Sequence, residues 1–473
     1  MKKYLLFVYL LWALGCKAQS LVVENESSII ETSEGKPFLW LGDTAWELFH
    51  ALNKEEIIRY LDNRYDKGFT VIQAVVISEL NGLETPNAYG ELPLIDNDPA
   101  RPNERYFQLI DFVVEETAKR DMYVAILPAW GSYVEETEGK PSLFHPENAY
   151  IYGRYLGNRY KDKAVIWILG GDRNVQTDMQ YQIWQAMAKG LYDIHKGKQL
   201  MSYHPTGDIS SHYWFHNDPW LSFNIVQSGH YKKPDMVYRY AGTYLQLSPT
   251  KPFLNAEPAY EDIPVYFWEY DDYAKYGKKK EDVMDERGLI KDPGYFAQGI
   301  YDDYDIRMQA YWTYLSGAAG YTYGNNAIWQ MYKQGGKYSV PCITYWEEAM
   351  DRPGADDMRH VKTLFTQYPL GTFQSDLSAV FGVNLNDENH VSSVVALDHS
   401  FILVYLSKGQ KVRINMSKLA KKGKAYWFDT REGVFQLIGE VDNSGILSFE
   451  PPKSNDQTGN DWLLIVDTKN NFP

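Results

Sequence analysis

Residues 165–174 read VIWILGGDRN, and this stretch decides how the chain is expected to fold. Five consecutive apolar residues of β-forming type predict a strand that is buried on both faces, as strands of parallel sheets usually are. Two glycines follow, and they allow the backbone to turn sharply. The turn presents the carboxylate of Asp172 at the carboxyl end of the strand. A parallel sheet with an acidic side chain at this edge is therefore the first prediction.

Similar apolar runs recur between residues 36 and 325, separated by longer amphipathic stretches. The eight predicted strands are 37–41, 70–76, 123–127, 165–169, 200–203, 223–227, 253–256 and 320–323. Apolar residues at helical spacing mark the intervening segments, for example 53–67 and 104–120. An open doubly wound sheet would normally carry a phosphate-binding glycine fingerprint after its first strand, and the sequence has none there. We therefore expect an α/β fold of the closed (β/α)8 TIM-barrel type.

Beyond about residue 372 the pattern changes to short alternating segments that are separated by turn residues. The predicted strands there are 392–397, 401–406, 411–415, 425–429, 446–449 and 462–467. This pattern favours a small C-terminal antiparallel β-sandwich. The predicted division is a signal peptide at 1–19, the barrel at 20–371 and the sandwich at 372–473.

The N-terminus has the layout of a secretory signal, with two lysines, an apolar run from residue 4 to 14 and a short polar segment. We expect an exported protein of the bacterial periplasm or cell surface. The segment 13–16 resembles a lipoprotein box, so the alternatives are lipidation of Cys16 and simple cleavage after Ala18 or Gln19. The apolar run is too short to remain as a transmembrane helix. Attachment to a membrane would therefore depend on a lipid at Cys16.

Charge and composition restrict the class of partner. The formal net charge is −15 and there is no long Lys/Arg run, which argues against a nucleic-acid partner. Aromatic residues make up 15% of the chain, with 14 Trp and 38 Tyr, and flat rings with a polar tip suit the faces of sugar rings. Large barrels also bury many aromatic residues, so composition leaves both explanations open.

Two acids stand at predicted strand ends in settings suited to catalysis. Asp172 follows the fourth strand and its two glycines, and Glu257 closes the seventh strand, 253–256. Cleavage of a glycosidic bond requires one carboxyl group to protonate the leaving oxygen and a second to attack the anomeric carbon or to activate water. Since active sites of such barrels lie at the carboxyl ends of the strands, these two acids are the candidate catalytic pair.

Other strand ends supply candidate substrate-binding residues. They are Asp43, Trp46, Trp130, Arg173, His204, Gln227, His230, Asn325 and Trp329. Asp43 is interpreted either as a ligand of two adjacent sugar hydroxyls or as a cap of the following helix. Arg173 is interpreted either as a ligand of a substrate carboxylate or as a neutralising neighbour of Asp172.

The sequence offers little support for a metal site or a serine nucleophile. Four histidines, His204, His212, His216 and His230, fall in one region, but only the middle pair has helical i, i+4 spacing and the Glu of a zinc-peptidase motif is missing. No Gly-x-Ser-x-Gly elbow occurs. We therefore expect neither a metal nor another cofactor.

The motifs just described resemble those of the apiosidase-like group, glycoside hydrolase family 140 and its relatives, from bacterial pectin-degrading systems. The resembling segments are 41–46, 170–174, 204–205, 220–224, 227–230 and 257–261, and 427–433 looks like the motif of the collagen-binding-like domain that follows such barrels. The resemblance implies Asp172 as general acid/base, Glu257 as nucleophile and an apiose-linked side chain of rhamnogalacturonan II as one substrate. Clan relatives usually carry Asn-Glu where this chain has Gly171-Asp172, and the shorter acid requires that either the strand end or the substrate lies closer.

The resulting hypothesis is an exported glycoside hydrolase that removes a terminal sugar, with apiose as one candidate, from a complex polysaccharide such as pectin. The alternative from another class is a non-catalytic carbohydrate- or matrix-binding protein of the cell surface built on an inactive barrel. A peptidase is a third interpretation, and the lack of a metal or nucleophile motif argues against it.

Overall fold

The computed structural model describes residues 20–137, 141–270, 279–453 and 459–469. The predicted signal peptide and Cys16 lie outside these residues. Among the described residues, no helix is both long and apolar enough to cross a membrane.

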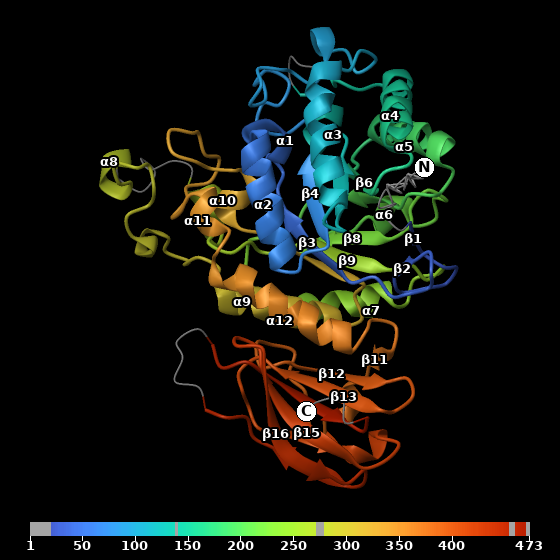
Figure 1. Cartoon of the computed structure of the whole chain (residues 1–473), viewed down its shortest axis with the longest axis vertical. Coiled ribbons are helices and arrows are strands. Elements are labelled where there is room, and N and C mark those ends of the chain that lie inside the picture. The colour runs from blue at the N-terminus through green and yellow to red at the C-terminus, as the bar shows by residue number, and fades with distance from the viewer. Residues whose placement is uncertain (1–19, 138–140, 271–278, 454–458, 470–473) are drawn as a thin grey trace, which may run out of the picture.

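Eight parallel strands form the barrel in the N-terminal part of the chain (Figure 1). They are β3 (Trp40–Thr44), β4 (Val71–Val75), β5 (Tyr123–Leu127), β6 (Val165–Gly170), β7 (Met201–His204), β8 (Asn224–Gln227), β9 (Phe253–Glu257) and β10 (Gly320–Tyr323). Hydrogen-bonded neighbours follow the order β7-β6-β5-β4-β3-β10-β9-β8. At the seam between β7 and β8, the amide of Ser222 donates to the carbonyl of Met201 at 2.8 Å. The predicted (β/α)8 barrel is confirmed.

Helices surround this sheet. The longer ones are α2 (Lys54–Asp66), α3 (Glu104–Ala118), α4 (Pro146–Tyr160), α5 (Asp178–His195), α9 (Asp303–Leu315) and α12 (Pro353–Gln367). Their starts follow from local sequence: Asn53 and Glu56 form a reciprocal capping box on α2, and Thr177 and Gln180 form one on α5. Apolar residues of these helices cover the outer face of the strands, which are buried along their whole length.

The first barrel strand begins three residues later than predicted. The sequence predicted a strand at 37–41, whereas β3 runs from Trp40 to Thr44. The indole of Trp40 donates to Thr322 of β10 inside the sheet, and the register pairs Asp43 with Tyr323. Asp43 therefore lies within the strand instead of following it, which changes the direction of its side chain.

The C-terminal part is an antiparallel sheet domain. Its six-stranded sheet has the order β11-β12-β13-β18-β15-β16, with β11 (Phe373–Ser375), β12 (Val391–Ala396), β13 (Phe401–Leu406), β18 (Trp462–Asp467), β15 (Gly423–Asp429) and β16 (Val434–Val441). The pair β14 (Val412–Asn415) and β17 (Ile446–Phe449) packs on one face through Ile414 and Phe449. Strand β16 was not predicted, because it is an edge strand whose residues are mostly exposed.

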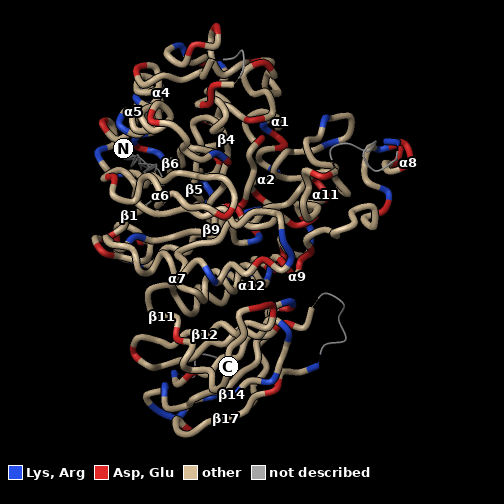
Figure 2. The backbone as a smooth tube through the Cα atoms, turned by 180° about the vertical axis from the view of Figure 1, so that it is seen from behind, with Lys and Arg blue, Asp and Glu red and all other residues tan. Residues whose placement is uncertain are grey.

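Helices α9 and α12 lie between the barrel and this domain (Figure 1). Apolar residues of both helices and of β12 and β13 form one continuous cluster. Arg307 of α9, only 1% exposed, contacts Asp303 at 2.6 Å, Asp357 of α12 at 2.8 Å and Asp461 of the C-terminal domain at 3.1 Å. Elsewhere acidic and basic residues are interspersed over both domains (Figure 2). The C-terminal domain is thus packed firmly on the barrel.

Candidate active site

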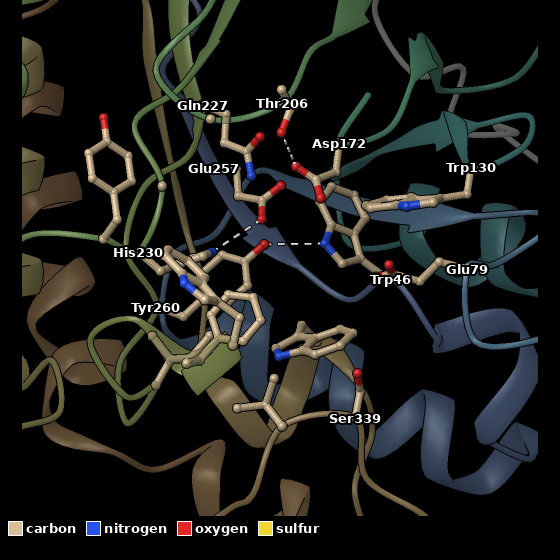
Figure 3. Close-up of a pocket in the computed structure, with 18 residues that line it drawn as sticks. Trp46, Glu79, Trp130, Asp172, Thr206, Gln227, His230, Glu257, Tyr260 and Ser339 are labelled. Carbon is tan, nitrogen blue, oxygen red and sulfur yellow. Dashed lines mark hydrogen bonds and ion pairs between the residues drawn. The ribbon is translucent and has the colours of Figure 1, made fainter. Parts of the chain in front are cut away.

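A cavity of about 350 Å³ opens among the carboxyl ends of the barrel strands (Figure 3). Its lining residues are Trp46, Glu79, Trp130, Asp172, Thr206, Gly207, Gln227, Gly229, His230, Tyr231, Glu257, Tyr260, Ile263, Phe267, Trp268, Trp329, Ser339 and Val340. Every barrel strand contributes at least one of them, either from its last residue or from the loop that follows. The cavity therefore occupies the position at which active sites of such barrels are built.

Asp172 reaches this cavity because the backbone turns after β6. Gly170 and Gly171 have φ values of 82° and 127°, and Asp172 itself has a φ of 47°. A side chain at Gly171 would lie 2.7 Å from the indole of Trp130, so a glycine is required by space as well as by conformation. The Thr206 hydroxyl donates to Asp172 Oδ1 at 2.9 Å. The sharp turn that the sequence predicted after this strand is therefore present in the structure.

Glu257 is the last residue of β9, and both of its carboxylate oxygens face imidazoles. His204 Nε2 lies 3.1 Å from Oε2, and His230 Nε2 lies 3.3 Å from Oε1. The first of these contacts lacks the alignment of a straight hydrogen bond. The carboxylate is almost buried, with 8% of the side chain exposed. Two elements, β7 and the loop after β8, therefore hold it in one orientation.

The surroundings move the two pKa values in opposite directions. Burial and the negative charge of Glu257 raise the pKa of Asp172, and the hydrogen bond from Thr206 only partly offsets them. Burial would also raise the pKa of Glu257, but the His204 and His230 imidazoles outweigh it and lower that pKa to about 2. One carboxyl is thus favoured as an acid and the other as an anion, which is the division of roles that glycosidic cleavage uses.

Five of the predicted binding residues line the cavity. They are Trp46, Trp130, Gln227, His230 and Trp329. The Trp46 indole donates to the Tyr260 hydroxyl at 3.2 Å and packs edge-on against Trp130. Trp130 Nε1 and Gln227 Oε1 have no hydrogen-bond partner within the described part of the chain. These two atoms are suited to bind sugar hydroxyls.

Two predicted binding residues contact the acids instead of the cavity. His204 is fully buried and faces Glu257. Arg173 contacts Asp172 Oδ2 at 3.4 Å and Glu135 at 3.1 Å through different guanidinium nitrogens. Of the two interpretations of Arg173, its contacts match that of a neutralising neighbour.

Asp43 and Asn325 lie away from the lining, and their predicted contact with substrate does not fit these positions. The Asp43 carboxylate is fully buried against α2, where it accepts hydrogen bonds from Tyr60 at 2.5 Å and Arg64 at 3.3 Å. It does not cap the following helix either. Asn325 accepts from the amide of Ala327 and thereby caps α10 (Asn326–Trp329), which carries Trp329 into the cavity. The physical reason in both cases is that a neighbouring helix supplies the hydrogen-bond partner, through side chains of α2 for Asp43 and through a backbone amide of α10 for Asn325.

Several lining residues were not predicted. Glu79 and Tyr260 follow β4 and β9, and Trp268 belongs to a later loop with 48% of its side chain exposed. Glu79 stands four residues beyond the end of β4, in a stretch without a glycine turn or repeated motif, so position alone could have identified it. Tyr260 lies within the resembling segment 257–261, but the sequence indicated no role for it.

The histidine region forms no metal centre among the described residues. His216 Nε2 lies 2.9 Å from the Pro249 carbonyl, and His212 packs against Tyr213 and Tyr244. Within the described ranges, no cluster of three or more His, Cys, Asp or Glu side chains is placed to hold an ion.

Two carboxyl groups in one cavity at the carboxyl end of a parallel barrel form an arrangement that is typical of glycoside hydrolases. Residues 24–372 match the family model described as "Apiosidase-like, catalytic domain", and the chain belongs to this family. Residues 375–467 match the model described as "Putative collagen-binding domain of a collagenase". No curated protein matches the chain.

Solved structures agree with this classification. A glycoside hydrolase family 5 structure from Bacteroides vulgatus is 29% identical, with a TM-score of 0.82, over 95% of this chain and 94% of that chain. A second structure, named only as a glycoside hydrolase, is 28% identical, with a TM-score of 0.82, over 96% of this chain and 98% of that one. The family match and both structures support glycosidase activity.

Proposed function

We propose that the protein is an exported glycoside hydrolase that removes a terminal sugar from a complex polysaccharide such as pectin, with Asp172 as general acid/base and Glu257 as nucleophile. The observation that carries the proposal is the pair of carboxyl groups in one cavity whose pKa values are shifted in opposite directions. The apiosidase-like family favours apiose as the sugar. Export rests on the signal-like N-terminus.

In the first step, the Asp172 carboxyl protonates the glycosidic oxygen while the Glu257 carboxylate attacks the anomeric carbon. The bond between carbon and leaving oxygen breaks, the remainder of the polysaccharide leaves as an alcohol, and a glycosyl ester forms on Glu257. The contacts from His204 and His230 keep this carboxylate ionised and oriented before the attack.

In the second step, the Asp172 carboxylate takes a proton from water, and the resulting oxygen nucleophile attacks the same carbon. The ester bond to Glu257 breaks, the sugar is released with its original anomeric configuration and Asp172 again carries a proton. Trp46, Trp130 and Trp329 line the cavity, and their flat rings suit one terminal sugar ring.

The test is release of monosaccharide from pectic and algal oligosaccharides, including fragments of rhamnogalacturonan II. We expect release by the wild-type chain and a loss of more than roughly 10⁴-fold for Glu257→Gln, since the nucleophile is removed. Glu147→Gln, which changes an exposed acid in the first turn of α4, is the matched control and should keep full activity. Full activity of both Glu257→Gln and Asp172→Asn would refute the assignment, and binding without release would favour a carbohydrate-binding protein.

A further inference from the structure

A third carboxyl group, that of Glu79, lines the cavity beside the proposed catalytic pair. The loop that carries it is fixed by the neighbouring β5 and its loop. The amide of Val76 donates to the Leu127 carbonyl at 2.8 Å, and the hydroxyl of Tyr133 donates to the Ser78 carbonyl at 2.8 Å. Figure 3 shows Glu79 reaching toward the cavity from the side on which Trp130 lies. Its position is therefore set by rigid neighbours.

The Glu79 carboxyl differs from the catalytic pair in its contacts. Asp172 is bonded to Thr206, and Glu257 faces two imidazoles. Within the described ranges, the Glu79 carboxyl has no hydrogen bond or ion pair to the protein. A largely buried polar group without a partner is costly, and the open side of this one is the cavity. A bound ligand would supply the missing partner.

The charge of the cavity limits what that ligand can be. Glu79, Asp172 and Glu257 line it together, whereas none of the described lining residues is a lysine or an arginine. Burial, then the negative charges of Asp172, Glu47 and Glu257, raise the pKa of Glu79 well above its ordinary value. A protonated carboxyl both donates and accepts hydrogen bonds, as a sugar hydroxyl does. A ligand carboxylate would meet three acidic side chains in the lining, and the nearby Arg173 is already paired with Asp172 and Glu135.

We propose that Glu79 binds the substrate directly, by donating a hydrogen bond to a hydroxyl of the terminal sugar, and that it selects a neutral sugar over a uronic acid. The proposal rests on the proposed function, because it takes the cavity as the site of the glycosyl group. It goes further in restricting the removed sugar to neutral ones, even where the polymer itself is acidic.

The choice of substitution distinguishes a binding role of Glu79 from a role as catalytic acid or base. Glu79→Gln keeps a donor and an acceptor, so kcat/KM on 4-nitrophenyl β-D-apioside should stay within about threefold of wild type, with an unchanged pH profile. Glu79→Ala removes both and should lower kcat/KM roughly tenfold. Glu84→Ala, an exposed acid in the same loop, is the matched control. A loss in Glu79→Gln as large as in Asp172→Asn, or no loss in Glu79→Ala, would overturn the proposal.

Binding can be measured without turnover, which separates this proposal from the proposed function. Full-length protein with Asp172→Asn is titrated by calorimetry with D-apiose, D-xylose, D-galacturonic acid and D-glucuronic acid. We expect the neutral sugars to bind at least roughly tenfold more tightly than the uronic acids, because like charges repel in a desolvated site. Adding Glu79→Ala to this variant should weaken the binding of the neutral sugars.

Three results would overturn the proposal. They are equal or tighter binding of a uronic acid, an affinity for neutral sugars that Glu79→Ala leaves unchanged, and no binding of any of the four sugars. A wild-type protein that releases no sugar but binds neutral sugars through Glu79 would instead contradict the proposed function alone. The two failures are thus distinguishable.

Discussion

Two Gly-Asp pairs at the carboxyl ends of barrel strands, Gly42-Asp43 on β3 and Gly171-Asp172 after β6, have opposite surroundings. Asp43 lies inside its strand, with no exposed area, and its carboxylate contacts Tyr60 and Arg64 of α2. Asp172 lies beyond its strand with a positive φ, and 34% of its side chain is exposed to the cavity.

The comparison shows that, of these two acids, only the one that the backbone turns away from the helices reaches the cavity. Inside the strand, alternate residues face the helix layer, where a buried carboxylate needs a cation. Beyond the strand, two glycines and a positive φ direct the side chain into the cavity, where it can contact the substrate. Local sequence looks alike at the two sites, but the consequences of substitution should differ.

The largest difference is expected for Asp172→Asn. This variant should lower kcat/KM roughly 10²- to 10⁴-fold on a natural glycoside, because an amide cannot protonate the leaving oxygen. The loss should be smaller on a 4-nitrophenyl glycoside, whose leaving group needs little protonation. The midpoint of guanidinium unfolding should not fall, since burial disfavours the charge that the substitution removes. Steady-state kinetics on both substrates, together with unfolding curves, check this.

Asp43→Asn should show the opposite pattern. It leaves Arg64, which has no exposed area, without its carboxylate, and breaking a buried ion pair costs about 3–5 kcal/mol of unfolding free energy. Turnover per folded molecule should stay close to wild type. Unfolding curves and active-site-normalised rates measure the two quantities. Loss of turnover at unchanged stability would instead place Asp43 in contact with substrate.

The main alkaline limb in the pH dependence of kcat/KM should report Asp172. Its pKa is raised, so the required proton is held at low pH and is lost as the pH rises through that value, and kcat/KM should fall on the alkaline side. Glu257 stays ionised far above its pKa of about 2, so we expect no acidic limb across the weakly acidic range. In Asp172→Asn, assayed with a 4-nitrophenyl glycoside, the alkaline limb should disappear. A limb that persists there would assign the titration to another group.

Much of the barrel was predictable because each buried parallel strand is a continuous apolar run that is bounded by turn residues. The runs at 123–127 and 320–323 match β5 and β10 in full. Strand β3 was misplaced because it continues beyond the apolar run 37–41 into Gly42-Asp43-Thr44, where the buried carboxylate of Asp43 finds hydrogen-bond partners on α2. Strand β16 was missed because an exposed edge strand lacks an apolar face.

The site was predictable where a residue stands directly at a strand end and less so where its partner is remote in sequence. Asp172 and Glu257 were found by position, and the structure places both in one cavity. The burial of His204 behind Glu257 could not be predicted, because it depends on how β7 and β9 lie across the barrel. Glu79 was missed because its importance comes from the charges around it, which only the assembled fold brings together.

The most direct test of the account is mass spectrometry of the Asp172→Asn chain during turnover of 4-nitrophenyl β-D-apioside. The good leaving group allows the first step, whereas the missing base slows the second, so a glycosyl ester should accumulate. The account predicts an added glycosyl mass on the peptide that contains Glu257. Release of sugar with inverted anomeric configuration and no adduct at Glu257 would contradict it.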